Sequence, residues 1–189
     1  RKMQCYERKL YRSVDLCIMT SEIEKQNVLD QAPCANVVVV PNGVDTTLLQ
    51  PPTTVSIRDT NDPALLFLGS LAYPPNHDAI LYFRNEIWPL IESRFPGVRW
   101  LIAGRNPAQE ILRLASPNVE VLGWVTDVCV LMHGSSAMIV PLRSGSGTRL
   151  KVLVAWAAGL PIVSTFIGAE GLEAHYGVNI LLADNPVQL

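Results

Sequence analysis

The sequence is poor in the residues that build metal centres, disulfide frameworks and membrane spans. Its 189 residues include only four cysteines and three histidines, and Cys5, Cys17, Cys34 and Cys129 form no Cys-x-x-Cys pair. We therefore expect reduced thiols, without a disulfide framework or a zinc site. Every apolar run is far shorter than the roughly 20 residues that a membrane-spanning helix needs. No basic-then-apolar leader pattern is present either, and these features together favour a soluble cytoplasmic domain.

The sequence also has no excess of positive charge. Fifteen Lys and Arg residues against 17 Asp and Glu residues give a formal net charge of -2. A general nucleic-acid binder normally carries a basic excess, so we expect no nucleic-acid partner. With 49% hydrophobic residues, the chain is long enough for one full domain core and a piece of a second.

Apolar segments of strand length alternate with longer mixed segments that fit helices. The apolar segments are mostly continuous runs, which indicates strands buried on both faces, as in a parallel sheet. Strands are predicted at residues 14–21, 36–42, 64–70, 98–104, 119–123, 136–141 and 161–165, and helices at roughly 3–12, 21–31, 76–94, 107–115, 126–134 and 149–158. This alternation predicts an α/β fold with a doubly wound parallel sheet.

A proline- and threonine-rich segment at residues 50–63, QPPTTVSIRDTNDP, has no apolar periodicity and is predicted to be a linker. It divides a front piece, residues 1–49, from a sheet-rich domain, residues 64–189. Two strands are too few for a stable independent sheet, so we expect the front piece to belong to a larger unit or to self-associate.

Glycines stand at the carboxyl ends of the predicted strands, which is where open α/β sheets bind ligands. The most informative end is the segment PLRSGSGTRLK, residues 141–151. It predicts a glycine-serine loop that runs into a helix, with Thr148 as the N-cap, Arg149 as the first helical residue and Lys151 as the third. Cations are unfavourable at the positive end of a helix dipole. An anion such as a diphosphate, bound by the loop amides and both side chains, would make them favourable. The alternative is a solvated helix start from which both side chains lean away.

The motifs narrow the identity of this anion. The loop does not fit the P-loop pattern, and the first strand of the main domain is followed by GSLAYPPN, which does not fit the dinucleotide pattern GxGxxG. No DxD or paired carboxylate stands at a strand end to hold magnesium. We therefore expect a nucleoside diphosphate bound without a metal and without a further cofactor.

Six blocks of the sequence together resemble one known family. They are VVVVPNGVDTTLLQPP, LLFLGSLAYPPNHDAILYF, WLIAGRNP, VEVLGWVTDV, IVPLRSGSGTRLKVLVAWAAGLPIVST and IGAEGLE. Their order and spacing are similar to those of the retaining glycosyltransferases of family 4 with the GT-B fold, and most of all to the bacterial subgroup tied to exopolysaccharide synthesis. The resemblance implies two Rossmann-like domains. Residues 64–189 would be the nucleotide-sugar donor domain, truncated at its C-terminus, and residues 1–49 the end of the acceptor domain.

The resemblance also implies roles for individual residues. Arg149 and Lys151 match the cations of the subgroup and would stabilise the leaving diphosphate, which makes them the candidate catalytic residues. Arg105 would reach the base or the phosphates, unless it is a surface arginine, and Glu170 would touch the sugar, unless it caps its own helix. The complete set of candidate donor-binding residues is Gly69, Ser70, Arg105, Trp124, Val125, Ser146, Gly147, Thr148, Val154 and Glu170.

Three features depart from the pattern of the family. The family glutamate that holds the ribose hydroxyls is replaced by Val154, and a second acidic position falls on Ser146. The loop after Gly69 lacks the arginine and lysine of many relatives. Because valine accepts no hydrogen bond, we expect nucleotide affinity at least ~10-fold below that of a glutamate-bearing relative.

The remaining conspicuous side chains are expected to be structural. We expect surface or helix-end positions for His77, His133 and His175. Asp127 is predicted to lie at a helix start. Core or interdomain packing is predicted for Trp88, Trp100 and Trp156.

Three functional hypotheses follow. In the first, the chain is the donor-binding part of a glycosyltransferase that moves a sugar from a nucleotide sugar to a glycan or lipid-linked acceptor, with peripheral membrane association of the full-length enzyme. The chain alone would then bind donor without turnover. In the second, it is a degenerate, non-catalytic binding or interaction module, which the valine at position 154 favours. The third, a carbohydrate-phosphate epimerase of the same two-domain type, fits the motifs less well.

Overall fold

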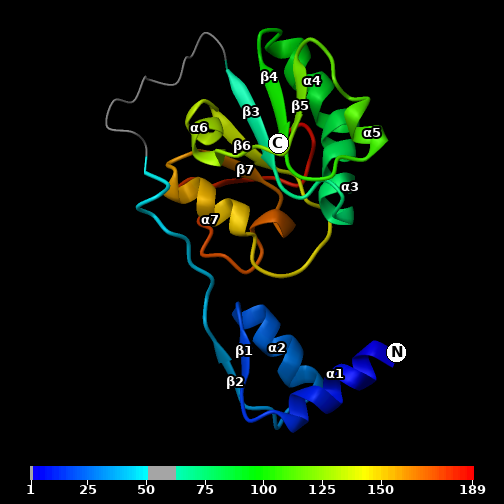
Figure 1. Cartoon of the computed structure of the whole chain (residues 1–189), viewed down its shortest axis with the longest axis vertical. Coiled ribbons are helices and arrows are strands. Elements are labelled where there is room, and N and C mark those ends of the chain that lie inside the picture. The colour runs from blue at the N-terminus through cyan, green and yellow to red at the C-terminus, as the bar shows by residue number, and fades with distance from the viewer. Residues whose placement is uncertain (1, 51–62) are drawn as a thin grey trace.

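The computed structural model describes residues 2–50 and 63–189 (Figure 1). The predicted linker at residues 50–63 lies almost entirely outside this range. Along the described chain the elements form two separate parallel sheets, one of two strands and one of six. The assignment of residues 1–49 and 64–189 to two different domains stays a prediction.

The front piece contains α1 (Lys2–Ser13), β1 (Cys17–Met19), α2 (Glu22–Gln31) and β2 (Val37–Val39). The two strands pair in parallel, with Cys17 opposite Val37. Ser21 caps α2, since its hydroxyl accepts a hydrogen bond of 3.2 Å from the Glu24 backbone N–H. All four elements overlap the predicted ranges.

The main sheet has the order β5-β4-β3-β6-β7-β8, and each pairing is parallel. Its strands are β3 (Ala64–Leu68), β4 (Arg99–Ala103), β5 (Val119–Gly123), β6 (Ala137–Val140), β7 (Ile162–Ser164) and β8 (Leu181–Leu182). The prediction of an α/β fold with a parallel sheet is confirmed. The sequence missed β8 because two residues are too few to show a periodic pattern.

Helices pack on this sheet at α3 (Pro74–Tyr82), α4 (Trp88–Arg94), α5 (Gln109–Leu112), α6 (Val128–His133) and α7 (Leu150–Ala157). The single helix predicted at residues 76–94 is interrupted by a π-helical turn at Phe83–Ile87, and a short 3₁₀ helix spans Ile167–Ala169. None of the helices in the described part of the chain is long and apolar enough to cross a bilayer.

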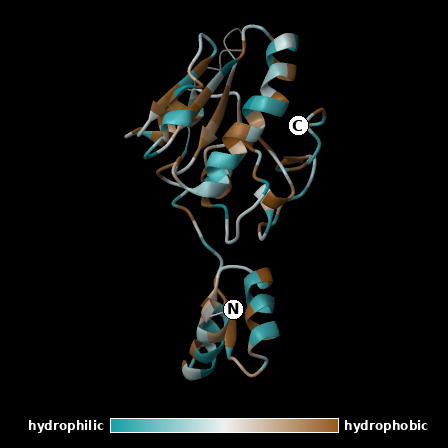
Figure 2. Ribbon diagram, turned by 90° about the vertical axis from the view of Figure 1, so that its right-hand side faces the viewer, coloured by the Kyte–Doolittle hydropathy of each residue, from teal (hydrophilic) through white to brown (hydrophobic). Residues whose placement is uncertain are grey.

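The core lies between the sheet and its helices. In Figure 2 the strands are largely brown, whereas the helices carry teal on part of their surface, as expected for a sheet buried on both faces. Phe83 packs against Trp100 with ring centroids 4.7 Å apart, and Trp88 lies 5.6 Å from Trp100. All three side chains are fully buried. Trp88 and Trp100 are therefore core residues, as predicted.

The strand order places a ligand crevice at one point of the sheet. From β3 the chain proceeds outward through β4 and β5, and from β6 it proceeds in the other direction through β7 and β8 (Figure 1). The strands β3 and β6 are neighbours from which the chain winds in opposite directions. In open α/β sheets the crevice outside the carboxyl ends of such a strand pair binds ligands.

Candidate anion site at the switch point of the sheet

A pocket of about 390 Å³ lies at the carboxyl ends of β3 and β6. One wall is the loop after β3 with the first turn of α3, and the other is the glycine-serine loop after β6 with the first turns of α7. Seven predicted site residues line it together, namely Gly69, Ser70, Ser146, Thr148, Arg149, Lys151 and Val154. Among the described residues, neither aspartate nor glutamate lines this pocket.

Arg149 is buried at the base of the glycine loop. Its side chain turns back into the loop, and Nη1 donates hydrogen bonds of 2.6 Å to the carbonyl oxygens of Ser146 and Gly147. The residue is only 8% exposed, so it does not lean into solvent. The alternative of a solvated helix start is therefore wrong for this side chain.

The predicted helix cap needs a correction. The helix α7 begins at Leu150, and Arg149 occupies the N-cap position without a side-chain cap. Thr148 therefore lies one residue before the N-cap, and its hydroxyl donates to the Thr20 hydroxyl at 3.1 Å. Lys151 is consequently the second helical residue, and it still projects from the first turn.

Two features of the loop leave donors available to an anion. The Nε atom of Arg149 is buried and has no hydrogen-bond partner among the described residues. Within the same range, no group accepts from the backbone N–H groups of Ser146 or Gly147. A buried donor without a partner is costly, and an anion in the pocket would remove that cost.

Lys151 is the second cation of the pocket. Its Nζ atom donates to Asn76 Oδ1 at 2.8 Å and lies 4.5 Å from the centroid of the Phe67 ring. Burial, and then the nearby positive charge of Arg149, lower the pKa of Lys151 from 10.5 to about 7. The ammonium is therefore only partly populated at neutral pH, and a bound anion would favour its charged form.

Asn76 is a site residue that the sequence analysis missed. Its Oδ1 atom accepts from Lys151, and its Nδ2 atom donates to the Ser70 carbonyl oxygen at 2.9 Å. It is buried in the first turn of α3. The signal was its position, since a polar residue directly after the proline-rich turn that follows β3 must lie at the crevice.

Two glycines allow the loops after β3 and β4 to meet behind the pocket. A Cβ atom on Gly104 would lie 1.6 Å from the Gly69 carbonyl oxygen. A Cβ atom on Gly69 would lie 2.8 Å from Asn76 Nδ2 and 2.9 Å from Lys151 Nζ. Any side chain at either position would displace backbone or polar groups of the site.

A second, smaller pocket of about 250 Å³ adjoins the first through Gly69 and Ser70. Its outer wall is formed by Arg105, whose guanidinium carbon lies 4.0 Å from the centroid of the Trp124 ring. Trp124 is 60% exposed, so its ring presents a flat surface beside the glycine loops. Val125 instead packs, half-buried, against the core.

An ion pair that the sequence did not predict ties the two walls of the main pocket. Arg143, at the start of the loop after β6, donates from Nε to Asp78 Oδ2 at 3.0 Å, and Asp78 belongs to α3. The guanidinium also lies 4.6 Å from the Tyr82 ring centroid. These contacts fix the spacing between α3 and the glycine-serine loop.

Besides Val125, two predicted residues line neither of these two pockets. Gly147 faces the front piece and has a φ of +80°, which favours glycine. Glu170 is exposed and follows the 3₁₀ helix Ile167–Ala169. It is the C-cap residue of that helix, and its backbone N–H donates to the Ile167 carbonyl oxygen, so it caps a helix end through its backbone.

The residues expected to be structural largely behave so. Asp127 caps α6, because its side chain accepts from the Val130 backbone N–H at 3.1 Å. His77 lies 3.4 Å from Glu110, His133 ends α6, and His175 is exposed. Within residues 2–50 and 63–189, His, Cys, Asp and Glu side chains form no cluster of three or more that could hold a metal.

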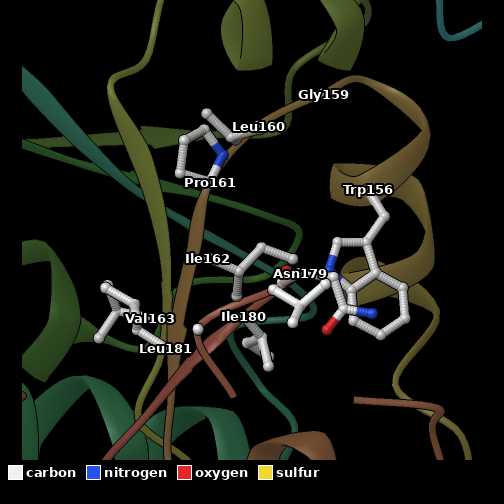
Figure 3. A pocket seen from close by; sticks show the side chains of 11 residues that line it. Trp156, Gly159, Leu160, Pro161, Ile162, Val163, Asn179, Ile180 and Leu181 are labelled. Carbon is white, nitrogen blue, oxygen red and sulfur yellow. Dashed lines mark hydrogen bonds between the residues drawn. The ribbon is translucent and has the colours of Figure 1, made fainter. Parts of the chain in front are cut away.

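Trp156 packs away from the switch point. Its Nε1 atom donates to the Asn179 carbonyl oxygen at 2.7 Å. Figure 3 shows its indole beside Asn179, with Leu160 and Pro161 leading into β7 at Ile162, in an apolar pocket of about 620 Å³. This pocket lies at the opposite end of β7 from the glycine loops and offers few polar groups.

The fold is that of a Rossmann-like α/β protein with a crevice at the switch point of its sheet, and comparison with known proteins narrows the class. Residues 62–189 match the family of glycosyl transferases group 1. The chain therefore belongs to this family, with the GT-B architecture. The family 4 subgroup stays a prediction.

The curated relatives are distant and longer. A protein of the cps region of Klebsiella pneumoniae is 28% identical over 144 residues, which are 68% of this chain and 36% of the relative. The phosphatidyl-myo-inositol mannosyltransferase of Mycobacterium tuberculosis is 27% identical over 141 residues, 71% of this chain and 36% of the relative. The match thus spans about a third of the length of either relative.

Solved structures share the fold at low identity. Anabaena HepE in complex with UDP and glucose is 18% identical with a TM-score of 0.73, covering 97% of this chain and 54% of that one. TarM is 14% identical with a TM-score of 0.77, covering 99% and 37%. The sucrose-phosphate synthase of Thermosynechococcus elongatus is 15% identical with a TM-score of 0.77, covering 99% and 50%.

Proposed function

We propose that this chain is the donor-binding part of a retaining glycosyltransferase of family 4. It binds a nucleoside-diphosphate sugar, and the complete enzyme transfers the sugar to a glycan or lipid-linked acceptor. The observation that carries the proposal is the convergence of two cations, the buried Arg149 and the half-buried Lys151, on one pocket at the switch point of the sheet.

The pocket chemistry fits a diphosphate. Nη1 of Arg149 is occupied by loop carbonyls, but its Nε atom and the loop amides still lack acceptors among the described residues. Lys151 adds a second positive charge from the first turn of α7, and the pocket lining contributes no carboxylate that would compete for either cation. A phosphate group would receive charge-assisted hydrogen bonds from both cations.

The adjoining pocket supports a place for the base. It opens on the same two residues, Gly69 and Ser70, and ends on the stacked pair of Arg105 and Trp124. A diphosphate at the first pocket would direct the nucleoside toward this flat surface. The UDP complexes of HepE, a structural relative, are consistent with a nucleotide ligand.

The chemical contribution of these residues would be electrostatic. Breaking the bond between the sugar and the diphosphate develops negative charge on the leaving oxygen. Arg149, Lys151 and the loop amides would be positioned in advance to stabilise that charge, without a metal ion. Because the match covers about a third of the length of the curated relatives, we expect this chain to bind donor without turnover. We further expect a cytoplasmic enzyme with peripheral membrane association and a role in exopolysaccharide synthesis.

Isothermal titration of the chain with UDP, GDP and ADP tests the proposal. One of them should bind, and Lys151→Gln should weaken that binding by ~10-fold or more, since a charge-assisted hydrogen bond contributes about 1.5–3 kcal/mol. Arg113→Gln, which removes an exposed cation directly after α5, serves as the control. Lack of binding by all three nucleotides in the wild-type chain would overturn the proposal.

The second candidate function is a degenerate binding module. Val154, which lines the pocket where a carboxylate would hold a ribose, favours it. The same titration separates the two candidates, because a degenerate module binds no nucleotide.

A further inference from the structure

The front piece reaches the glycine-serine loop through a relay of side chains. The Thr148 hydroxyl donates to the Thr20 hydroxyl at 3.1 Å, and the Thr20 hydroxyl donates to Glu24 Oε2 at 2.6 Å. The Thr20 backbone N–H donates to the same carboxylate oxygen at 3.0 Å. Glu24 is thus held in a fixed position at the start of α2, against the rim of the candidate anion site.

The other carboxylate oxygen of Glu24 faces the loop. Oε1 lies 3.5 Å from the point that a Cβ atom on Gly147 would occupy. Within the described residues this oxygen accepts no hydrogen bond, and the side chain is half-buried. The carbonyl oxygen of Gly147 also accepts a hydrogen bond from Arg149, so the carboxylate and the guanidinium both lie next to Gly147.

A carboxylate at this place distinguishes two kinds of ligand. It repels a free terminal phosphate, because both groups are negative. It also accepts hydrogen bonds from hydroxyl groups, of which a sugar has several. The pocket lining itself has no carboxylate that could accept hydrogen bonds from them. In a nucleotide sugar the terminal phosphate is esterified, so it carries less negative charge and has hydroxyl groups just beyond it.

We propose that Glu24 is a specificity-determining residue that accepts a hydrogen bond from a hydroxyl group of the transferred sugar and disfavours the free nucleoside diphosphate. This inference rests on the proposed function. It gives the front piece a direct part in donor recognition, and it would favour release of the diphosphate once the sugar has left.

The test compares two ligands in one variant. Glu24→Gln keeps an oxygen for the Thr20 hydrogen bonds but removes the charge. We expect its affinity for the free diphosphate to rise and its affinity for the sugar conjugate to fall, so that their ratio changes about tenfold, the equivalent of a single lost hydrogen bond to a charged group. The probes are UDP with UDP-glucose and GDP with GDP-mannose, measured by isothermal titration with the chain of 189 residues.

A matched control removes the same charge two residues away. Glu22 lies on the same turn of α2, with its side chain 76% exposed and 3.5 Å from Lys25. Glu22→Gln should leave the ratio of the two affinities unchanged. Thermal unfolding of both variants and the wild type should agree within a few degrees, which shows that the contact between the two pieces survives.

The outcomes separate this inference from the proposed function. If the wild-type chain binds a diphosphate but Glu24→Gln leaves the ratio of the two affinities unchanged, the role of Glu24 is overturned. The proposed function then still stands. If the wild-type chain binds neither pair of probes, the proposed function and the role of Glu24 both fall.

Discussion

Lys151 Nζ and Asn76 Oδ1 are joined by a hydrogen bond of 2.8 Å that spans the candidate anion pocket from α7 to α3. Asn76 is buried and uses its amide nitrogen to bind the Ser70 carbonyl oxygen, so its orientation is fixed from both ends. A neutral acceptor thereby directs the lysine without neutralising it. The positive charge remains available to a ligand.

Replacing this acceptor by a carboxylate should weaken anion binding. In Asn76→Asp the new charge would pair with Lys151 and repel phosphate, so we expect diphosphate affinity to fall ~10-fold or more. Asn85→Asp, at an exposed position of the following π-helical turn, makes the same charge change away from the pocket and should have little effect. Isothermal titration of both variants checks this, and equal affinities would contradict the role of Asn76.

Diphosphate binding should weaken as the pH rises above neutrality. The pKa of Lys151 is lowered to about 7 by burial and by Arg149, so in the free protein the ammonium form is lost as the pH rises through 7. Phosphate groups are already ionised there, because their second pKa lies near 6. A bound anion raises the pKa of the lysine, so binding takes up a proton, and affinity falls toward tenfold per pH unit between pH 7 and 9.

The matching variant removes the titrating group. In Lys151→Met, affinity should be low at every pH and show no such slope. Titrations in two buffers with different ionisation enthalpies measure the proton uptake directly near pH 8. An unchanged slope in the variant would assign the pH dependence to another group.

Gly104 should tolerate no side chain. A Cβ atom there would lie 1.6 Å from the Gly69 carbonyl oxygen and 2.7 Å from its carbonyl carbon, and both are backbone atoms of the β3 loop. Gly104→Ala must displace that loop, so we expect a loss of stability of about 3 kcal/mol together with loss of nucleotide binding. Gly97→Ala has no atom within 4 Å of the added carbon and should fold normally. Denaturant unfolding of the two variants measures the difference.

The fold was predictable because its signal is local. The strands from residues 64 to 164 are short continuous apolar runs, and each appears within a few residues of its predicted range. The π-helical turn at Phe83–Ile87 was not predictable, since it inserts an extra residue into a helix whose apolar pattern looks regular. Nor was β8, whose two residues depend on pairing with β7.

The candidate site was predictable in composition but not in geometry. Charge at a helix start singled out Arg149 and Lys151, and the structure brings both to one pocket. The sequence could not show that Arg149 turns back onto the carbonyl groups of its own loop, because that depends on backbone direction. Asn76 and Glu24 were missed for a related reason. Asn76 binds Lys151, which lies 75 positions further along the chain. Glu24 is linked to the loop through Thr20, whose partner Thr148 lies 128 positions away, and no spacing rule connects such pairs.

Val154 provides the sharpest test of how much donor affinity the pocket has lost. It lies three residues after Lys151 on α7, lines the same pocket and is half-buried. Val154→Glu would add an acceptor for ribose hydroxyl groups, and Lys151, one helical turn earlier, would offset part of its charge. We expect nucleoside diphosphate affinity to rise ~10-fold or more, since hydrogen bonds to charged groups contribute about 1.5–3 kcal/mol each.

The corresponding 2′-deoxynucleotide should gain less, because it lacks one of the hydroxyl groups that the new carboxylate would bind. Val154→Gln provides a polar control of the same size. Equal affinities of Val154→Glu and the wild-type chain for the ribonucleotide would show that the valine costs the site nothing, and that its donor is held by other groups.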